Sequence, residues 1–99
     1  MVVRGRSMEP ALLDGDRLLV RWSARRARPG VVAVVRLPDR PLSIKRIVSR
    51  QDGGWWVERD NPEVGVDSWQ VGAVPTEDLL GVALLRLTPS PGRIAPGTR

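Results

Sequence analysis

Short apolar runs bounded by turn residues recur along the whole chain, and none of them keeps a helical period for three turns. Alternating or β-branched runs of this length are typical of strands, and the Pro and Gly residues between them separate one strand from the next. We therefore expect a mainly β fold, either a small curled sheet or a partly open barrel. The expected strands are 16–22, 31–37, 42–49, 55–58 and 79–87, and the second and third are expected to form a hairpin across Asp39, Arg40 and Pro41.

The chain of 99 residues has the size of a single domain. Pro10 and Gly15 predict one helical turn over residues 9–13. Because the segment after Pro89 is rich in Pro and Gly, we expect a folded domain over residues 1–88 and a disordered tail over residues 89–99. No apolar run approaches the ~20 residues that span a bilayer, so we expect a cytoplasmic protein without a transmembrane anchor. Peripheral association with a membrane stays open.

The sequence contains neither cysteine nor histidine. This composition excludes thiol nucleophiles, disulfides, a Ser-His-Asp triad, and zinc held by imidazole or thiolate. We expect no metal site and no cofactor. The net charge of +5 raises nucleic acid as a partner, but most of the arginines are interleaved with acidic residues, so we do not expect nucleic-acid binding.

Lys45 is the single lysine among the 16 basic residues, and the others are all arginine. Arginine stays protonated in proteins, whereas burial can drive a lysine to its neutral form. Lys45 lies within an apolar strand pattern, where it shares one face with Ile47 while Ile44 and Arg46 share the other. If its face is buried, the amine could act as a general base.

Ser7 lies between the first apolar residues and the expected helical turn. Gly5 allows another backbone to approach closely, and the turn after Ser7 leaves N–H groups that could face a developing oxyanion. A serine hydroxyl needs an adjacent base to become nucleophilic. On these residues alone, an ordinary turn serine and a solvent-facing Lys45 remain an open alternative.

Two segments resemble the signal peptidase I-like serine–lysine proteases of the S24/S26 type. The run GRSMEPALLDGDRLLV (5–20) is similar to their serine motif, Gly-x-Ser-Met-x-Pro followed by Gly-Asp and an apolar strand, and SIKRIV (43–48) is similar to their lysine motif. The resemblance implies a fold of the signal peptidase/LexA-like type, a nucleophile at Ser7 and a general base at Lys45. We then expect these two side chains to lie within hydrogen-bond reach. The resemblance also implies that the backbone N–H groups of Ser7 and Gly5 donate to the oxyanion, and that Met8 and Pro10 contact the substrate.

A third segment, 58–74, is similar to the closing motif of the same family, where Asp60, Asn61, Asp67 and Ser68 match and are expected to form a structural motif near the site. Three positions depart from the family pattern. Arg59 replaces a glycine, Gly65 falls where many members carry a serine near the lysine, and Trp69 replaces an arginine. These departures imply a stiffer turn, the loss of a hydroxyl that would orient the amine, and an Asp67 without its usual salt-bridge partner.

Within this family, the short chain and Trp55-Trp56 followed by Asp-Asn-Pro are most similar to the maturation proteases of nickel-type superoxide dismutase. The resemblance implies a serine endopeptidase that removes an N-terminal leader or propeptide from a protein substrate. Two other hypotheses stay open. One is a self-cleaving relative of the repressor type, although only six residues precede Ser7 here. The other is a catalytically impaired, basic binding module.

Overall fold

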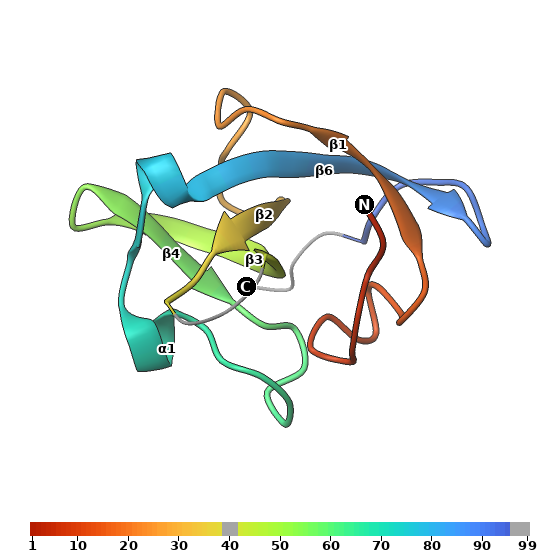
Figure 1. Cartoon of the computed structure of the whole chain (residues 1–99), viewed down its shortest axis with the longest axis horizontal. Coiled ribbons are helices and arrows are strands. Elements are labelled where there is room, and N and C mark those ends of the chain that lie inside the picture. The colour runs from red at the N-terminus through yellow and green to blue at the C-terminus, as the bar shows by residue number, and fades with distance from the viewer. Residues whose placement is uncertain (39–41, 96–99) are drawn as a thin grey trace.

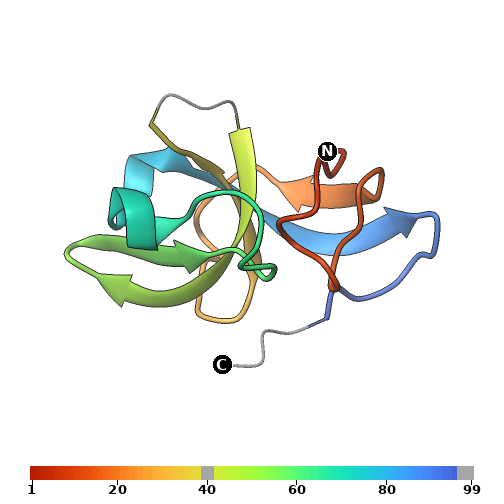
Figure 2. The same ribbon diagram turned by 90° about the horizontal axis from the view of Figure 1, so that it is seen from below.

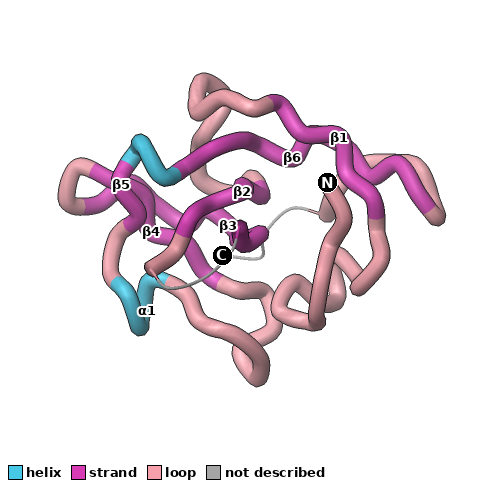
Figure 3. The backbone as a smooth tube through the Cα atoms, viewed as in Figure 1, coloured by secondary structure: helices cyan, strands magenta, loops and turns pink. Residues whose placement is uncertain are grey.

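The computed structural model describes residues 1–38 and 42–95, and most of the described chain is strand or loop (Figure 3). A four-residue helix and one turn of 3-10 helix lie between the fourth and sixth strands. The elements are β1 (Arg17–Arg21), β2 (Val32–Arg36), β3 (Leu42–Gln51), β4 (Gly54–Glu58), α1 (Ser68–Val71), β5 (Val74–Pro75), η1 (Thr76–Asp78) and β6 (Leu79–Thr88).

The six strands form one antiparallel sheet in the order β1-β6-β2-β3-β4-β5. β1 and β5 are its two edges, so the sheet curls without closing into a barrel (Figure 1). The mainly β fold expected from the strand patterns is confirmed. The expected strands correspond to β1, β2, β3, β4 and β6.

β2 and β3 form the expected hairpin, in which Val34 pairs with Ile44 and Ala33 pairs with Lys45. Their expected turn, Asp39 to Pro41, lies outside the described residues. Because side chains alternate along a strand, these two pairs face opposite sides of the sheet. Each side carries its own hydrophobic cluster, so residues 32–35 of β2 and residues 44–47 of β3 are buried whichever face their side chains take. One cluster comprises Ala33, Val35, Leu37, Ile47, Trp55, Val57, Val74, Leu79 and Val82, and the other comprises Val3, Met8, Leu12, Leu18, Val32, Ile44 and Ala83.

The helical segments agree only in part with the sequence expectation. Residues 9–13 lie in a turn closed by one helix-type hydrogen bond, from Leu12 N to Met8 O at 2.9 Å, which matches the single helical turn expected there and does not extend into a helix. The helix α1 was not expected, because four residues are too few to show a hydrophobic period. Its start is marked by a capping box between Asp67 and Gln70. Within the described chain, no helix is long and apolar enough to cross a membrane.

The described part of the expected tail, residues 89–95, turns back onto the domain. Gly92 exchanges backbone hydrogen bonds of 2.9 Å with Arg86 of β6, and Ile94 packs against the cluster that contains Val3 and Met8. Residues 96–99 lie outside the described residues. The division between a domain over 1–88 and a disordered tail over 89–99 stays a prediction.

Gly81 lies in β6 where the end of β1 crosses it closely. A Cβ atom on Gly81 would lie 2.8 Å from both Arg21 O and Val20 Cγ1. We expect Gly81→Ala to lower the free energy of unfolding by ~1–3 kcal/mol, because the added methyl forces the two strands apart. Leu84→Ala on the same strand is the control, since Leu84 is 36% exposed and should change stability by ~0.5 kcal/mol or less. Equal effects in chemical denaturation would contradict the prediction.

Candidate active site

Ser7 lies half-buried in the turn that follows the N-terminal segment, and Asn61 fastens this turn to the loop between β4 and α1. The backbone N–H of Asn61 donates to Ser7 O at 2.8 Å, and its side-chain Nδ2 donates to Arg6 O at 3.1 Å. Figures 1 and 2 show the loop running beside the Ser7 turn from two directions. The position of Ser7 therefore depends on a segment more than fifty residues further along the chain.

Lys45 lies in β3, where only 5% of its surface is exposed. Its backbone pairs with Ala33 on one side. On the other side, β4 pairs with β3 from Arg46 onward, so β4 does not cover residues 42–45. The lysine therefore lies at an open edge of the sheet while its side chain is buried, and burial works against the ammonium form of a lysine.

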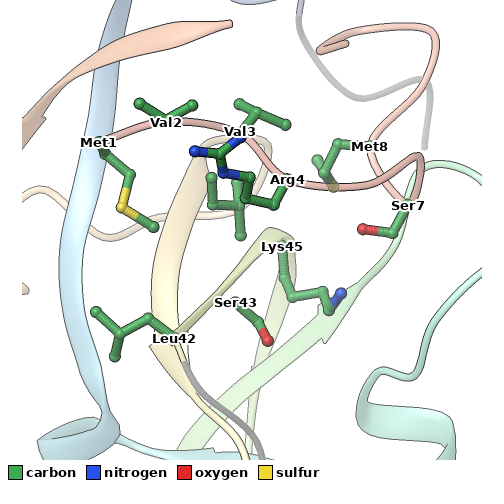
Figure 4. A pocket seen from close by; sticks show the side chains of 10 residues that line it. Met1, Val2, Val3, Arg4, Ser7, Met8, Leu42, Ser43 and Lys45 are labelled. Atoms are coloured by element: carbon green, nitrogen blue, oxygen red, sulfur yellow. The ribbon is translucent and has the colours of Figure 1, made fainter. Parts of the chain in front are cut away.

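Ser7 and Lys45 line the same pocket, and Figure 4 shows the serine hydroxyl and the lysine amine projecting into it. Gly65 lies next to both: a Cβ atom placed on it would be 3.4 Å from Ser7 Cβ and 3.8 Å from Lys45 Nζ. The pocket has a volume of about 120 Å³, which suits a small side chain better than a drug-sized ligand or a cofactor. Its lining consists of Met1, Val2, Val3, Arg4, Ser7, Met8, Leu42, Ser43, Ile44 and Lys45.

Asp60 anchors the loop to β3 through the residue after Lys45. Its carboxylate accepts two hydrogen bonds from Arg46, at 2.7 Å from Nη2 and 3.3 Å from Nε. A third bond runs from Arg46 Nη1 to Gly30 O at 2.9 Å. The Arg46 side chain is only 6% exposed, so this is a buried and bidentate ion pair.

Asp67 and Ser68 hold the other end of the same loop. Asp67 accepts from the backbone N–H of Arg59 and of Trp69, both at 3.0 Å, and Ser68 Oγ accepts from Val57 N at 2.9 Å. Both side chains are buried. None of the four matched residues lines the pocket. Asp60 and Asn61 reach the site indirectly, through Arg46 and through the backbone of Ser7, whereas Asp67 and Ser68 hold the far end of the loop.

Asp67 lacks its usual arginine at position 69, but it has another salt-bridge partner. Arg59 places its Nη1 3.8 Å from Asp67 Oδ2, and it also donates to Gln70 Oε1 at 3.1 Å and to Pro62 O at 2.9 Å. Trp69 instead donates its indole N–H to Glu58 Oε2 at 2.9 Å. Arg59 therefore ties both ends of the loop together, where the family's glycine would leave a flexible turn.

One further expected role needs correction. The N–H of Gly5 donates to Asp14 Oδ1 at 2.7 Å, so it is already engaged and does not face the pocket as an oxyanion donor. Pro10 is exposed and lies outside the pocket lining, and its contact with substrate stays a prediction. Met8 does line the pocket, although it is 1% exposed and belongs mainly to the core. The oxyanion role of the Ser7 N–H stays a prediction.

The sequence analysis missed part of the lining, namely residues 1–4 and 42–44. Ser43 could have been found, because it lies two positions before Lys45 and therefore on the same face of the strand. Arg4 could not, since nothing in the sequence indicates that the first residues run alongside β3. As for metals, no cluster of three or more His, Cys, Asp or Glu is found over residues 1–38 and 42–95.

An open, mainly β sheet that brings a turn serine and a buried lysine to one pocket has the arrangement expected of a serine–lysine peptidase. A sequence model of the Peptidase S24-like family matches residues 1–78, and the chain belongs to this family. Its members are serine peptidases or self-cleaving repressors. Comparison with curated proteins and with solved structures gives no significant match.

The Arg46–Asp60 pair gives a stability prediction. Asp60→Ala would leave the buried Arg46 guanidinium without its carboxylate, and we expect the free energy of unfolding to fall by ~3–5 kcal/mol in chemical denaturation. Asp78→Ala is the matched control, because it breaks the exposed Arg36–Asp78 pair, whose side chains are 59% and 30% exposed. The control should lose ~1 kcal/mol or less. If Asp60→Ala lost no more stability than the control, the buried Arg46 guanidinium would not need the Asp60 carboxylate, and the prediction would be contradicted.

Proposed function

We propose that the protein is a serine endopeptidase in which Ser7 is the nucleophile and Lys45 the general base. The observation that carries the proposal is the placement of both side chains in one pocket beside Gly65, with the lysine almost fully buried. Burial disfavours the ammonium form, so a neutral amine becomes accessible to take the proton of the serine hydroxyl. No other basic side chain of the sequence can do this, because all the others are arginines.

The proposed reaction has two halves. The Ser7 Oγ forms a bond to the scissile carbonyl carbon while its proton passes to Lys45 Nζ, and the backbone N–H of Ser7 donates to the oxyanion. The ammonium then returns the proton to the leaving amine as the carbon–nitrogen bond breaks. Water next attacks the acyl-serine, giving one proton to Lys45, and Ser7 recovers its hydroxyl proton as the acid product leaves. The Ser43 side chain, on the same face of β3 as Lys45, contributes to the polar surroundings of the amine.

An extended peptide fits between the N-terminal segment and β3. Val3 directs its backbone N–H to Asp16 O and its C=O to Gly15 N, both at 2.8 Å, so the polar groups of Val2 and Arg4 point to the opposite side. Across the pocket, residues 42–45 extend beyond the region paired with β4. A substrate strand between these two edges could form backbone hydrogen bonds with both. The small pocket volume favours small side chains near the cut.

We further propose that the substrate is a protein with an N-terminal leader or propeptide, and the precursor of nickel-type superoxide dismutase is the first candidate. The resemblance of the tryptophan pair and the Asp-Asn-Pro run to such maturation proteases supports this choice. The expected cytoplasmic location belongs to the same proposal. Any nickel belongs to the substrate.

The nucleophile is tested by Ser7→Ala. We expect this variant to fold as the wild type does, because a half-buried turn hydroxyl contributes little to stability, and to lose all cleavage of the candidate precursor. Mass spectrometry of the precursor after incubation gives the cut site, and circular dichroism checks the fold. The wild type could instead cleave its own chain, at a rate independent of its concentration, and leave the precursor intact. This result would favour the self-cleaving type of family member.

The base is tested by Lys45→Arg, which keeps the positive charge but cannot present a neutral amine near pH 7. We expect cleavage to fall by at least ~100-fold, the lower end of what a general base contributes. In the wild type, the rate should rise with pH as the neutral amine forms. Substantial activity of Lys45→Arg in a preparation where Ser7→Ala is inactive would show that another group is the base.

A further inference from the structure

The ionisable side chains of the pocket are all basic. Of the ten lining residues, Arg4 and Lys45 carry basic side chains, and none is an aspartate or glutamate. Arg4 is exposed, and Figure 4 shows its side chain at the pocket, on the wall formed by the N-terminal segment. A peptide that enters between the two walls therefore meets a permanent positive charge before it reaches the serine.

The other arginines around the site are engaged within the protein. Arg6 pairs with Glu9 at 3.3 Å, Arg46 pairs with Asp60 at 2.7 Å, and Arg59 pairs with Asp67 at 3.8 Å. None of the ion pairs found among residues 1–38 and 42–95 includes Arg4. Of these arginines, Arg4 is the one whose guanidinium remains available to a substrate, and its planar donors match a carboxylate in a bidentate manner.

We propose that Arg4 forms a subsite for an acidic side chain of the substrate, close to the scissile bond. This inference rests on the proposed endopeptidase function and adds a substrate class to it. Arg4 lies three positions before Ser7, and an extended chain rises about 3.3 Å per residue, so at most ~10 Å of backbone separates the two. The acidic residue therefore lies within about three residues of the cut.

The preference should be measurable and moderate. Arg4 is exposed, so its ion pair with the substrate is partly screened by water, and pairs of this kind change affinity by a few-fold to tenfold. The effect should fall on KM rather than on kcat, because the guanidinium is a binding group and does not touch the reacting atoms. High salt should weaken it.

The experiment compares cleavage sites in one library of proteome-derived peptides, identified by mass spectrometry for the wild type and for Arg4→Glu. We expect aspartate or glutamate to be enriched ~3–10-fold at one position within three residues of the cut in the wild type. Arg4→Glu should replace this preference with lysine or arginine at the same position. Arg4→Gln, which keeps the length and removes the charge, should lose the preference without reversing it, and it also serves if the glutamate variant does not fold.

Arg25→Glu is the matched control, since it changes the net charge equally on an exposed residue that does not line the pocket. It should keep the wild-type profile. An identical change in Arg25→Glu and Arg4→Glu would overturn the proposal in favour of a general electrostatic effect, as would a wild-type profile without acidic enrichment. Complete lack of Ser7-dependent cleavage in the library and in the candidate precursor would instead overturn the proposed function, and the subsite would fall with it.

Discussion

The Arg46–Asp60 ion pair connects the two halves of the site. It joins β3, one residue after Lys45, to the loop that begins after β4, at 2.7 Å and with the arginine almost fully buried. The next residue of that loop, Asn61, donates its backbone N–H to Ser7 O at 2.8 Å. Two adjacent residues thus hold the lysine strand and the serine turn to one another. Because loss of either partner would leave an uncompensated buried charge, the pair fixes the position of the loop against β3.

The burial of the lysine comes from the sheet and not from the Arg46–Asp60 ion pair. Lys45 follows Ile44 and precedes Arg46 and Ile47 in a strand with hydrophobic clusters on both faces. Its strand is nevertheless open to a ligand, since β4 leaves residues 42–45 uncovered. A lysine in the middle of the sheet would be buried but unreachable, and one on an exposed edge would stay charged. A position just beyond the end of the neighbouring strand satisfies both needs.

Much of the fold could be predicted from local patterns. The alternation in residues 16–22 and 42–49 and the turn residues between the runs were enough to predict the strands, because side-chain alternation is a local property. The single lysine among sixteen basic residues also directed attention to Lys45. What could not be predicted depends on contacts between distant segments. The engagement of Gly5 by Asp14, and the run of residues 1–4 alongside β3, follow from tertiary packing and leave no periodic signal.

The partner of Asp67 illustrates the same limit at the level of a single interaction. Comparison position by position indicated that this carboxylate lost its usual partner with the arginine at 69, and the structure shows that Arg59 pairs with it from the other end of the loop. The backbone N–H of Arg59 donates to the same carboxylate at 3.0 Å, so its guanidinium needs only to fold back along the loop to pair with Asp67. The residue that replaced the arginine is then used differently, since the Trp69 indole N–H donates to the buried carboxylate of Glu58 and its ring packs edge-on against Trp56 at 5.3 Å. The two departures from the family pattern therefore act together, and neither can be judged from the sequence without the other.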